Sequence, residues 1–112
     1  MIKKKINKPW GNEELIELNK SYCFKKLFMK KGHRCSLQFH KKKIETLFVY
    51  KGDLYLEINK KNIILKEGES ITLNPGDIHR MSAKKNDVTY YESSTPELDD
   101  VVRVEDDYGR KN

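Results

Sequence analysis

The stretch that decides the fold reads Gly32-His33-Arg34-Cys35-Ser36-Leu37-Gln38-Phe39-His40 and continues through Lys41-Lys42-Lys43-Ile44 to Glu45. Side chains two residues apart on a β-strand share a face, so Gln38 and His40 are expected to point the same way. Four residues of turn then reverse the chain, and Glu45 begins the next strand. We therefore expect these three side chains to converge on one side of two adjacent strands.

A second segment, residues 68–79, supplies a fourth side chain. It ends in the turn sequence Asn-Pro-Gly-Asp at residues 74–77, which presents His79. Two imidazole nitrogens and two oxygens suit a divalent cation of intermediate hardness. The sequence predicts one divalent ion, of zinc, manganese, cobalt, nickel or iron, bound by Gln38, His40, Glu45 and His79. The alternative is that both histidines are ordinary side chains of a barrel interior.

Segments with a strand-like period of two extend outward from this stretch on both sides. Aromatic and branched residues alternate with polar ones between glycine and lysine turns, and this pattern is typical of a β-sandwich or barrel. The segment Glu13–Leu18 is the exception, and we expect it to be helical. The predicted strands are Tyr22–Met29, Ser36–His40, Glu45–Lys51, Leu54–Ile58, Ile63–Leu65, Ser70–Leu73, His79–Ala83 and Val88–Ser93.

The chain of 112 residues is expected to form a single domain, residues 1–112, with its barrel core at about 22–94. The acidic tail from Pro96 contains several valines and is expected to pack across the barrel. No apolar run approaches the ~18 residues of a membrane span. The basic start lacks an apolar segment after it, so we expect a cytoplasmic protein with no membrane association. Cys23 and Cys35 are then expected to be reduced thiols.

The net charge of +6 raises the question of nucleic-acid binding. The positive charge comes mostly from lysines spread along the chain, and the last part of the sequence is acidic. No nucleic-acid-binding motif accompanies the lysines, so we expect a solvated surface and no nucleic-acid partner. The run Lys41–Lys43 beside the predicted metal site could attract an anionic ligand.

The spacing of these residues resembles the cupin superfamily, whose two motifs run G-x5-H-x-H-x4-E-x6-G and G-x5-P-x-G-x2-H-x3-N. The first motif corresponds to Gly32, Gln38, His40, Glu45 and Gly52, and the second to Gly68, Asn74, Gly76, His79 and Ala83. The resemblance implies an all-β fold, the cupin double-stranded β-helix or jelly-roll barrel. Gln38 stands where the motif has a histidine, and a neutral amide oxygen is a weaker ligand, so the metal should exchange more easily.

A narrower resemblance, to the cupin domain of type II mannose-6-phosphate isomerases, lies in four segments. They are Lys8-Pro9-Trp10-Gly11, Arg34 to His40, Pro75 to Arg80, and Val101 to Arg110. In many members this domain follows a sugar-nucleotide pyrophosphorylase domain, and the present chain resembles a free-standing version. The family has H-H-R-A-E-H-W where this chain has residues 41–47, so a histidine and an aromatic ring are replaced by Thr46 and Leu47.

The resemblance implies a metal-dependent isomerase, acting as a homodimer on a phosphorylated or nucleotide-linked sugar. Such an isomerase moves a proton between C1 and C2 and must stabilise an enediolate. By position, the candidates for the base are His33, Glu92 and Asp77. Arg110 joins His33 and Glu92 as a candidate catalytic residue.

The sugar and its phosphate also need binding groups. The four arginines of the chain all fall in the family-like segments, and guanidinium groups bind phosphate by paired hydrogen bonds. The predicted substrate-binding residues are Trp10, Arg34, Arg80 and Arg103. The competing interpretations are a surface position for His33, a structural role for Trp10, and ion pairs between the arginines of residues 103–110 and the acidic residues beside them.

Two other functions stay open. The first is a non-catalytic cupin that binds a sugar and accompanies an enzyme of carbohydrate biosynthesis. The second is a cupin epimerase or dioxygenase, although a dioxygenase would favour iron and normally has more histidine ligands than this chain supplies.

Overall fold

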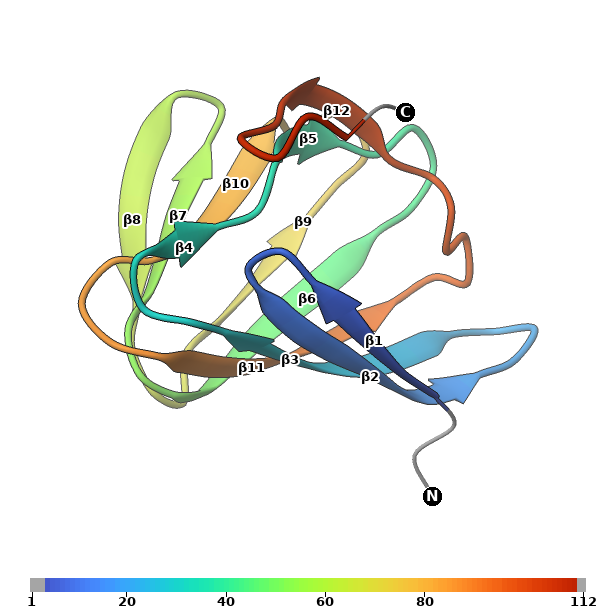
Figure 1. The fold of residues 1–112 in the computed structure, drawn as a ribbon. Helices are drawn as coiled ribbons and strands as arrows, with labels where there is room; N and C mark the ends of the chain where they lie inside the picture. Colours follow the sequence, from blue (N-terminus) through green and yellow to red (C-terminus); the bar gives the residue numbers. More distant parts are fainter. Residues whose placement is uncertain (1–3, 111–112) are drawn as a thin grey trace.

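Two antiparallel β-sheets lie face to face in the computed structural model, which describes residues 4–110 (Figure 1). The first sheet has the strand order β1 (Lys4–Lys8), β2 (Gly11–Leu18), β3 (Cys23–Met29), β11 (Val88–Ser94), β6 (Glu45–Lys51) and β9 (Ser70–Leu73). The second has the order β12 (Val102–Glu105), β5 (Leu37–Phe39), β10 (His79–Ala83), β7 (Leu54–Ile58) and β8 (Lys61–Leu65), with β4 (His33–Arg34) also paired to β10.

Strands distant in sequence are neighbours in both sheets. β11 pairs with β3 on one side and β6 on the other, and β10 lies between β5 and β7. This order makes the two sheets a jelly-roll barrel, so the predicted all-β fold is confirmed. Residues 4–110 contain no helix that is long and apolar enough to span a membrane.

The helix expected over Glu13–Leu18 is wrong, because this segment forms most of β2. It pairs with β1 on one side and β3 on the other. The register with β3 shifts between Leu15 and Glu17. This bulge puts Leu15 opposite Lys25 and Leu18 opposite Cys23. The side chains of Lys25 and Cys23 are both buried. The spacing of three between the two leucines, which fits a helical turn, therefore comes from one extra residue in a strand.

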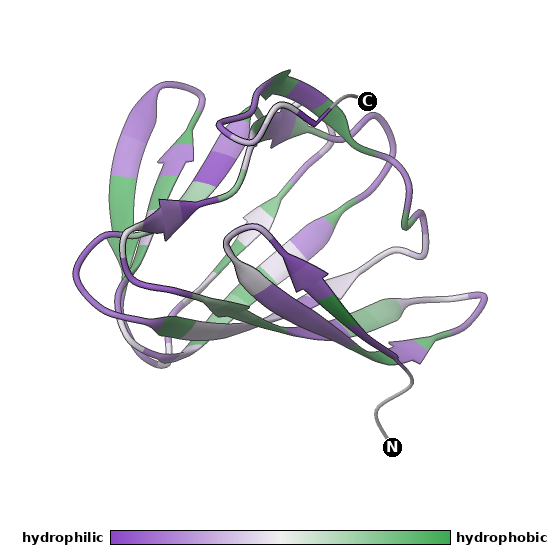
Figure 2. Ribbon diagram, viewed as in Figure 1, coloured by the Kyte–Doolittle hydropathy of each residue, from purple (hydrophilic) through white to green (hydrophobic). Residues whose placement is uncertain are grey.

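The other predicted strands are present, with some ends shifted by one or two residues. Four segments have the bounds that the sequence predicts: β6, β7, β9 and β10. The strand expected over Ser36–His40 is shorter, because His40 already belongs to the turn that leads into β6. Hydrophobic and hydrophilic residues alternate along the strands (Figure 2), as a sheet with one buried face requires.

The space between the sheets holds the hydrophobic core. Its members come from both sheets and include Trp10, Leu27, Met29, Cys35, Leu47, Val49, Leu54, Leu56, Leu65, Leu73, Met81, Ala83, Val88 and Tyr90. Cys23 and Cys35 are buried free thiols, as predicted. Trp10 is 5% exposed and belongs to this core, which supports the structural role considered for it.

The C-terminal segment returns across the barrel, as predicted. It forms β12, which adds to the second sheet beside β5. Farther along, the Tyr108 hydroxyl donates a hydrogen bond of 3.0 Å to the Arg34 carbonyl oxygen. Asp107 accepts two hydrogen bonds from the Arg34 guanidinium, at 2.6 and 2.9 Å. The segment thus ties the rim of the second sheet before reaching residue 110.

Candidate functional site

A cavity of about 460 Å³ lies at one end of the barrel, between the sheets and the C-terminal segment. Residues from β1, β2, β3, β6 and β11 line it on one side, and the region of β5 and β12 lines it on the other. The predicted site residues that contribute to its wall are Trp10, Gln38, His40, Glu45, Glu92, Arg103 and Arg110.

His40 and Glu45 lie at the two ends of the turn that joins β5 to β6. The Nδ1 atom of His40 donates a hydrogen bond to the carbonyl oxygen of Asp100, so it carries a proton. The Nε2 atom of the same ring lies 2.6 Å from Glu45 Oε1. A neutral ring would direct its Nε2 lone pair at this carboxylate, which is favourable only when a proton or a metal cation lies between the two atoms.

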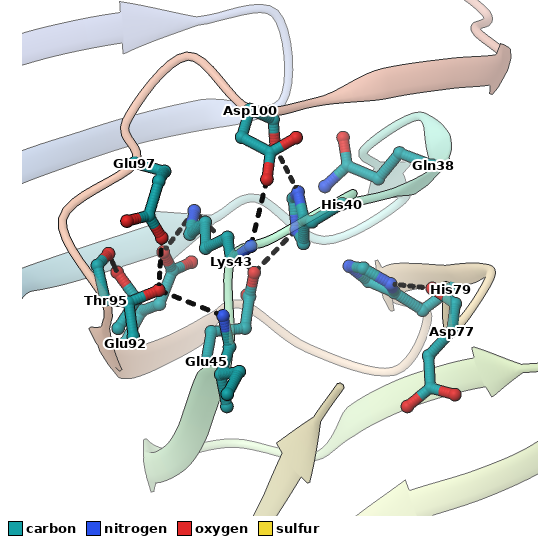
Figure 3. A network of polar contacts seen from close by, with 12 residues as sticks. Gln38, His40, Lys43, Glu45, Asp77, His79, Glu92, Thr95, Glu97 and Asp100 are labelled. Atoms are coloured by element: carbon teal, nitrogen blue, oxygen red, sulfur yellow. Dashed lines mark hydrogen bonds and ion pairs between the residues drawn. The ribbon is translucent and has the colours of Figure 1, made fainter. Parts of the chain in front are cut away.

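His79 begins β10 and is 0% exposed. Its Nδ1 atom donates a hydrogen bond of 2.8 Å to the Asp77 carbonyl oxygen, and its Nε2 atom has no hydrogen-bond partner within residues 4–110. One ligand atom each from His40, Glu45 and His79 lies within 4.8 Å of the others. Figure 3 shows the three side chains. The structure therefore brings together three buried groups whose free atoms suit a divalent cation such as zinc.

The electrostatics of Glu45 and His79 match this chemistry, whereas the pKa shift of His40 favours its protonated form, whose proton a metal ion would displace. Burial acts to raise the pKa of Glu45, but the His40 hydrogen bond and the Lys43 charge outweigh it and lower the pKa to about 2. Burial lowers the pKa of His79 below its ordinary value of 6.5. For His40, burial acts to lower the pKa, but the hydrogen bond and charge of Glu45 outweigh it and raise it. At neutral pH, Glu45 is thus a carboxylate and His79 a neutral imidazole, which are the forms that bind metal.

Gln38 lies beside this cluster, but its amide oxygen bonds to another residue. It is the direct cross-strand neighbour of His79, so the two side chains share the inner face of the second sheet. Its Oε1 atom accepts a hydrogen bond of 2.8 Å from the Ser36 hydroxyl. In Figure 3 the amide nitrogen lies toward His40 and the oxygen away from it. The oxygen would have to turn inward, away from Ser36, to act as a fourth ligand.

A second set of buried charges continues from Glu45 along the cavity wall. The Lys43 Nζ atom lies 3.7 Å from Glu45 Oε1 and 3.1 Å from Glu92 Oε2 (Figure 3). Glu92 is the cross-strand neighbour of Lys25, whose Nζ atom lies 3.4 Å from a Glu13 oxygen. The pKa of Glu92 is raised by burial and by the nearby Glu45 charge, although Lys43 and Lys25 oppose the shift.

Asp100 positions the site, and the sequence analysis did not identify this role. Its carboxylate accepts hydrogen bonds from the backbone amides of Lys41, Lys42 and Lys43 at 3.0, 2.7 and 2.9 Å. These bonds lower the pKa of Asp100 to about 2, and its carbonyl oxygen orients His40. The acidic pair Asp99-Asp100 was visible in the sequence, but its contact with a turn some sixty residues away was not.

Arg103 and Arg110 belong to the cavity wall on the side of the C-terminal segment. Arg110 pairs with Asp106 through its Nε and Nη2 atoms, both at 2.9 Å. This is the local ion pairing that the sequence analysis considered for the tail. Arg110 can therefore bind an anion only by sharing or exchanging Asp106.

Other predicted site residues lie away from the cavity. Arg34 pairs with Asp107, and Arg80 pairs with Glu105 at 2.8 Å and with the Cys35 carbonyl oxygen. These two arginines and His33 line a separate groove on the outer side of the second sheet. Asp77 accepts hydrogen bonds from Asn59 and from the Asn74 amide, within the turn before His79. Its visible role is to shape that turn.

The two-sheet barrel and the His/Glu/His cluster inside it define a cupin. Solved structures share the fold: capsular polysaccharide assembling protein CapF from Staphylococcus aureus has a TM-score of 0.80 and 13% identity, over 91% of this chain and 34% of that one. KdgF from Halomonas sp. has a TM-score of 0.77 and 13% identity, over 86% of this chain and 88% of that one.

Sequence comparison then gives the family. The chain belongs to the family described as mannose-6-phosphate isomerase C-terminal, whose model matches residues 1–106. It is 32% identical to mannose-1-phosphate guanylyltransferase ManC of Salmonella typhimurium, over 96% of this chain and 23% of that protein. It is 27% identical to alginate biosynthesis protein AlgA of Pseudomonas aeruginosa, over 94% of this chain and 23% of that protein. The chain thus spans about a quarter of the length of these relatives.

Proposed function

We propose that this protein is a metal-dependent isomerase that interconverts the aldose and ketose forms of a phosphorylated sugar. The observation that carries the proposal is the combination of two adjacent features, both of which include residues of the cavity wall. One is the cluster of His40, Glu45 and His79, with free ligand atoms facing one another. The other is the buried pair of Lys43 and Glu92 next to it.

His40, Glu45 and His79 would hold the metal ion, with Gln38 as a fourth ligand after rotation of its amide. A divalent ion bound there would polarise the substrate carbonyl and stabilise negative charge on its oxygens. The backbone carbonyls of Asp77 and Asp100 keep both imidazole rings in the orientation that leaves Nε2 free. The metal remains a proposal for this chain, as does its identity among zinc, manganese, cobalt, nickel and iron.

Glu92 is the group we assign to proton transfer between C1 and C2 of the sugar. It lies on the cavity wall with Glu45, and Lys43 lies between the two carboxylates. Burial raises its pKa from the ordinary value of 4.5, and a base works best when its pKa approaches the working pH. His33, another candidate for the base, lies in the outer groove.

The substrate phosphate would bind at the side of the cavity that carries Arg103 and Arg110. Lys4 and Lys8 line the same cavity, so the positive groups come from both ends of the chain. Guanidinium groups bind phosphate oxygens in pairs. A phosphate would compete with Asp106 for Arg110, and its higher charge favours it in that competition.

The test is an assay of purified protein with mannose 6-phosphate and a panel of sugar phosphates, with and without added manganese, cobalt, nickel or zinc. We expect metal-dependent formation of a ketose phosphate. Glu92→Gln should lower kcat at least about 100-fold while metal uptake stays unchanged. Glu57→Gln, a carboxylate outside the cavity, is the matched control. No turnover in any combination would overturn the proposal.

The metal itself is tested separately by elemental analysis and titration calorimetry. His79→Ala should lower the affinity for the metal by about 10- to 100-fold. His33→Ala should leave this affinity unchanged. Protein that takes up none of these four ions, and no iron(II) either, would exclude the metal site.

A non-catalytic sugar-binding role has one specific observation in its favour. In the cavity wall, the Arg110 guanidinium already pairs with Asp106, so it is not preformed as a phosphate anchor. Saturable binding of a sugar phosphate without turnover in the same assay would establish this second function. An epimerase or dioxygenase would appear instead as a changed sugar stereocentre or as oxygen uptake.

A homodimer and a cytoplasmic location stay predictions for this protein. Sedimentation velocity of the purified chain at several concentrations measures the first, and cell fractionation the second. A concentration-independent monomer would exclude the dimer.

A further inference from the structure

Glu13 and Lys25 form a charged pair in the cavity wall that the proposed mechanism does not use. The Lys25 Nζ atom lies 3.4 Å from Glu13 Oε1, and both residues line the cavity. They lie on the neighbouring strands β2 and β3, where Glu13 is opposite Leu27. Lys25 is opposite Leu15 on β2. Replacing a buried ion pair by apolar side chains is often neutral or stabilising, so this pair indicates a function.

Both members of the pair have unused hydrogen-bonding capacity. An ammonium group has several donors and a carboxylate several acceptor sites, but within residues 4–110 each group has one hydrogen bond, to the other. The Oε2 atom of Glu13 has no partner there, and it is not enclosed either, because the enclosed polar atoms without a partner belong to other residues. The side chains are 12% exposed for Glu13 and 11% for Lys25. A ligand in the cavity can therefore reach both groups.

The register of the first sheet places this pair between the proposed base and the proposed phosphate site. On the inner face, Lys25 of β3 is the cross-strand neighbour of Glu92 of β11. On the other side, β2 pairs with β1, which carries the cavity lysines Lys4 and Lys8. Adjacent strands lie about 4.8 Å apart, so β11 and β1 are separated by about 14 Å, with β3 and β2 between them. A sugar phosphate that reaches from Glu92 toward these lysines passes over the pair.

We propose that Glu13 and Lys25 bind two neighbouring hydroxyl groups of the sugar, on the carbons between its reacting end and its phosphate. This inference rests on the proposed function, because it takes the cavity as a sugar-phosphate site, and it adds the part of the substrate that the site distinguishes. The Glu13 carboxylate accepts a hydrogen bond from one hydroxyl, and the Lys25 ammonium group donates one to the next. Leu15 and Leu27, which also line the cavity, offer apolar surface to the carbon-bound hydrogens.

The ligand class is therefore a sugar phosphate with hydroxyl groups on two adjacent middle carbons. A sugar with a deoxy position at either carbon leaves one member of the pair without a partner after water has been displaced, and such a loss weakens binding. Glu13 and Lys25 are thus specificity-determining residues. They act on binding and not on proton transfer, since Glu92 lies nearer to the metal cluster.

The experiment compares the two faces of β2 and β3. The inner double variant, Glu13→Gln with Lys25→Met, removes both charges and leaves neither one buried alone. The matched outer variant is Glu14→Gln with Lys26→Met, because these two residues are cross-strand neighbours on the opposite face of the same strands. Glu13→Gln alone, which preserves the shape of the side chain, keeps the test independent of the stability of the double variant.

Kd is measured by calorimetry for mannose 6-phosphate, glucose 6-phosphate and fructose 6-phosphate, in the presence of the metal ion that the wild type takes up. For the sugar that the wild type binds most tightly, the inner variant and Glu13→Gln should each raise Kd at least about tenfold, the loss expected for one hydrogen bond to a charged group. The outer variant should leave Kd unchanged, and metal uptake should be the same in all of these proteins.

Two further measurements separate direct contact from a structural role. If the wild type turns the sugar over, the inner variant should raise KM about tenfold and change kcat less than about threefold, as expected for groups that bind away from the reacting carbons. Of the 3-deoxy and 4-deoxy analogues, at least one should bind the wild type about tenfold more weakly than the parent sugar does. The inner variant should bind that analogue and the parent equally well, as a double-mutant cycle requires for a direct contact.

The outcomes distinguish this inference from the proposed function. If the wild type binds a sugar phosphate and the inner variant binds it equally well, or if a deoxy analogue loses the same affinity in both proteins, the pair is structural. This inference then falls while the proposed function stands. If the wild type binds none of the three sugar phosphates, both are overturned.

Discussion

Each face of the sheet segment formed by β3, β11 and β6 carries some side chains that are unusual for that face. The inner face carries Lys25, Glu45 and Glu92, all buried. The outer face carries aromatic rings: Tyr50 is 62% exposed and Phe48 is 42% exposed. Further rings on this outer face come from Phe24, Phe28 and Tyr91, and Tyr91 lies between Phe24 and Tyr50 in stacked and edge-on contacts.

Most of this inner face is apolar, as a half-buried sheet requires, and it carries Leu27, Leu47, Val49 and Tyr90. The three buried charged side chains depart from this pattern. Buried charges reduce stability unless they are paired, so their presence indicates a function for that end of the barrel. The aromatic rings on the outer face are also unusual, because a surface exposed to water seldom carries so many aromatic side chains. The contrast locates chemistry on the inner face and leaves the outer face as an apolar surface.

The largest expected loss of stability comes from breaking the ion pairs of Lys43 with Glu45 and Glu92. Lys43→Met removes the cation between Glu45 and Glu92 and leaves two buried carboxylates without it. We expect a loss of about 3 kcal/mol in the free energy of unfolding at pH 7. The loss should shrink at lower pH, because protonation of Glu92 removes one of the charges. Urea unfolding at several pH values measures both effects.

Lys42→Met is the matched control for this substitution. Lys42 occupies the same turn but is exposed, so its loss should change the free energy of unfolding by less than about 0.5 kcal/mol. If both substitutions changed the free energy of unfolding equally, the ion pairs of Lys43 would contribute nothing to stability. The buried charges would then not distinguish the inner face from the outer one.

A smaller loss of stability is expected when the Asp100 carboxylate, which binds the backbone of the turn before β6, is changed. The three backbone amides that bond to Asp100 lower its pKa to about 2. Its stabilising contribution is therefore complete above about pH 4 and is lost as pH falls toward 2. Asp100→Asn should cost about 1 to 2 kcal/mol at pH 7, a figure kept low because this carboxylate is partly exposed.

The pH dependence distinguishes this role from a general loss of stability. The difference between wild type and Asp100→Asn should narrow as the solution is acidified below pH 4. Asp99→Asn changes the neighbouring carboxylate, which is exposed, and should have little effect at any pH. A constant difference across the acid range would refute the assignment to the Asp100 carboxylate.

The smallest effect is expected on the outer face. Tyr50→Ser removes a ring that is more than half exposed, so the free energy of unfolding should fall by less than about 1 kcal/mol, mainly through the lost contact with Tyr91. Chemical unfolding at several protein concentrations measures it. A loss as large as that of Lys43→Met would show that the outer rings stabilise the fold, and the distinction between the two faces would fail.

Much of this architecture was predictable from the period of two along the sequence. The bounds of β6, β9 and β10 follow from alternation between clear turn residues, and the spacing of His40, Glu45 and His79 was sufficient to predict their convergence. Glu13–Leu18 was not predictable, because a bulge in a strand and a turn of a helix give the same spacing of leucines.

The arginines show a different limit of sequence reasoning. Arg80 and Arg103 both lie on strands of the second sheet, but only Arg103 reaches the cavity. The face on which each side chain lies depends on register, and register is set by pairing between distant strands. The positioning role of Asp100 was hidden for the same reason, because its partners lie in the turn before β6.

The place of β11 between β3 and β6 also has a consequence for biosynthesis. Residues 88–94 are the last of the three strands to leave the ribosome, yet they occupy the middle position. Until they emerge, β3 and β6 each expose an unpaired edge with aromatic side chains beside it, and such edges invite aggregation. We expect chains truncated before residue 88 to be insoluble, and the full chain to fold only after synthesis has passed this strand.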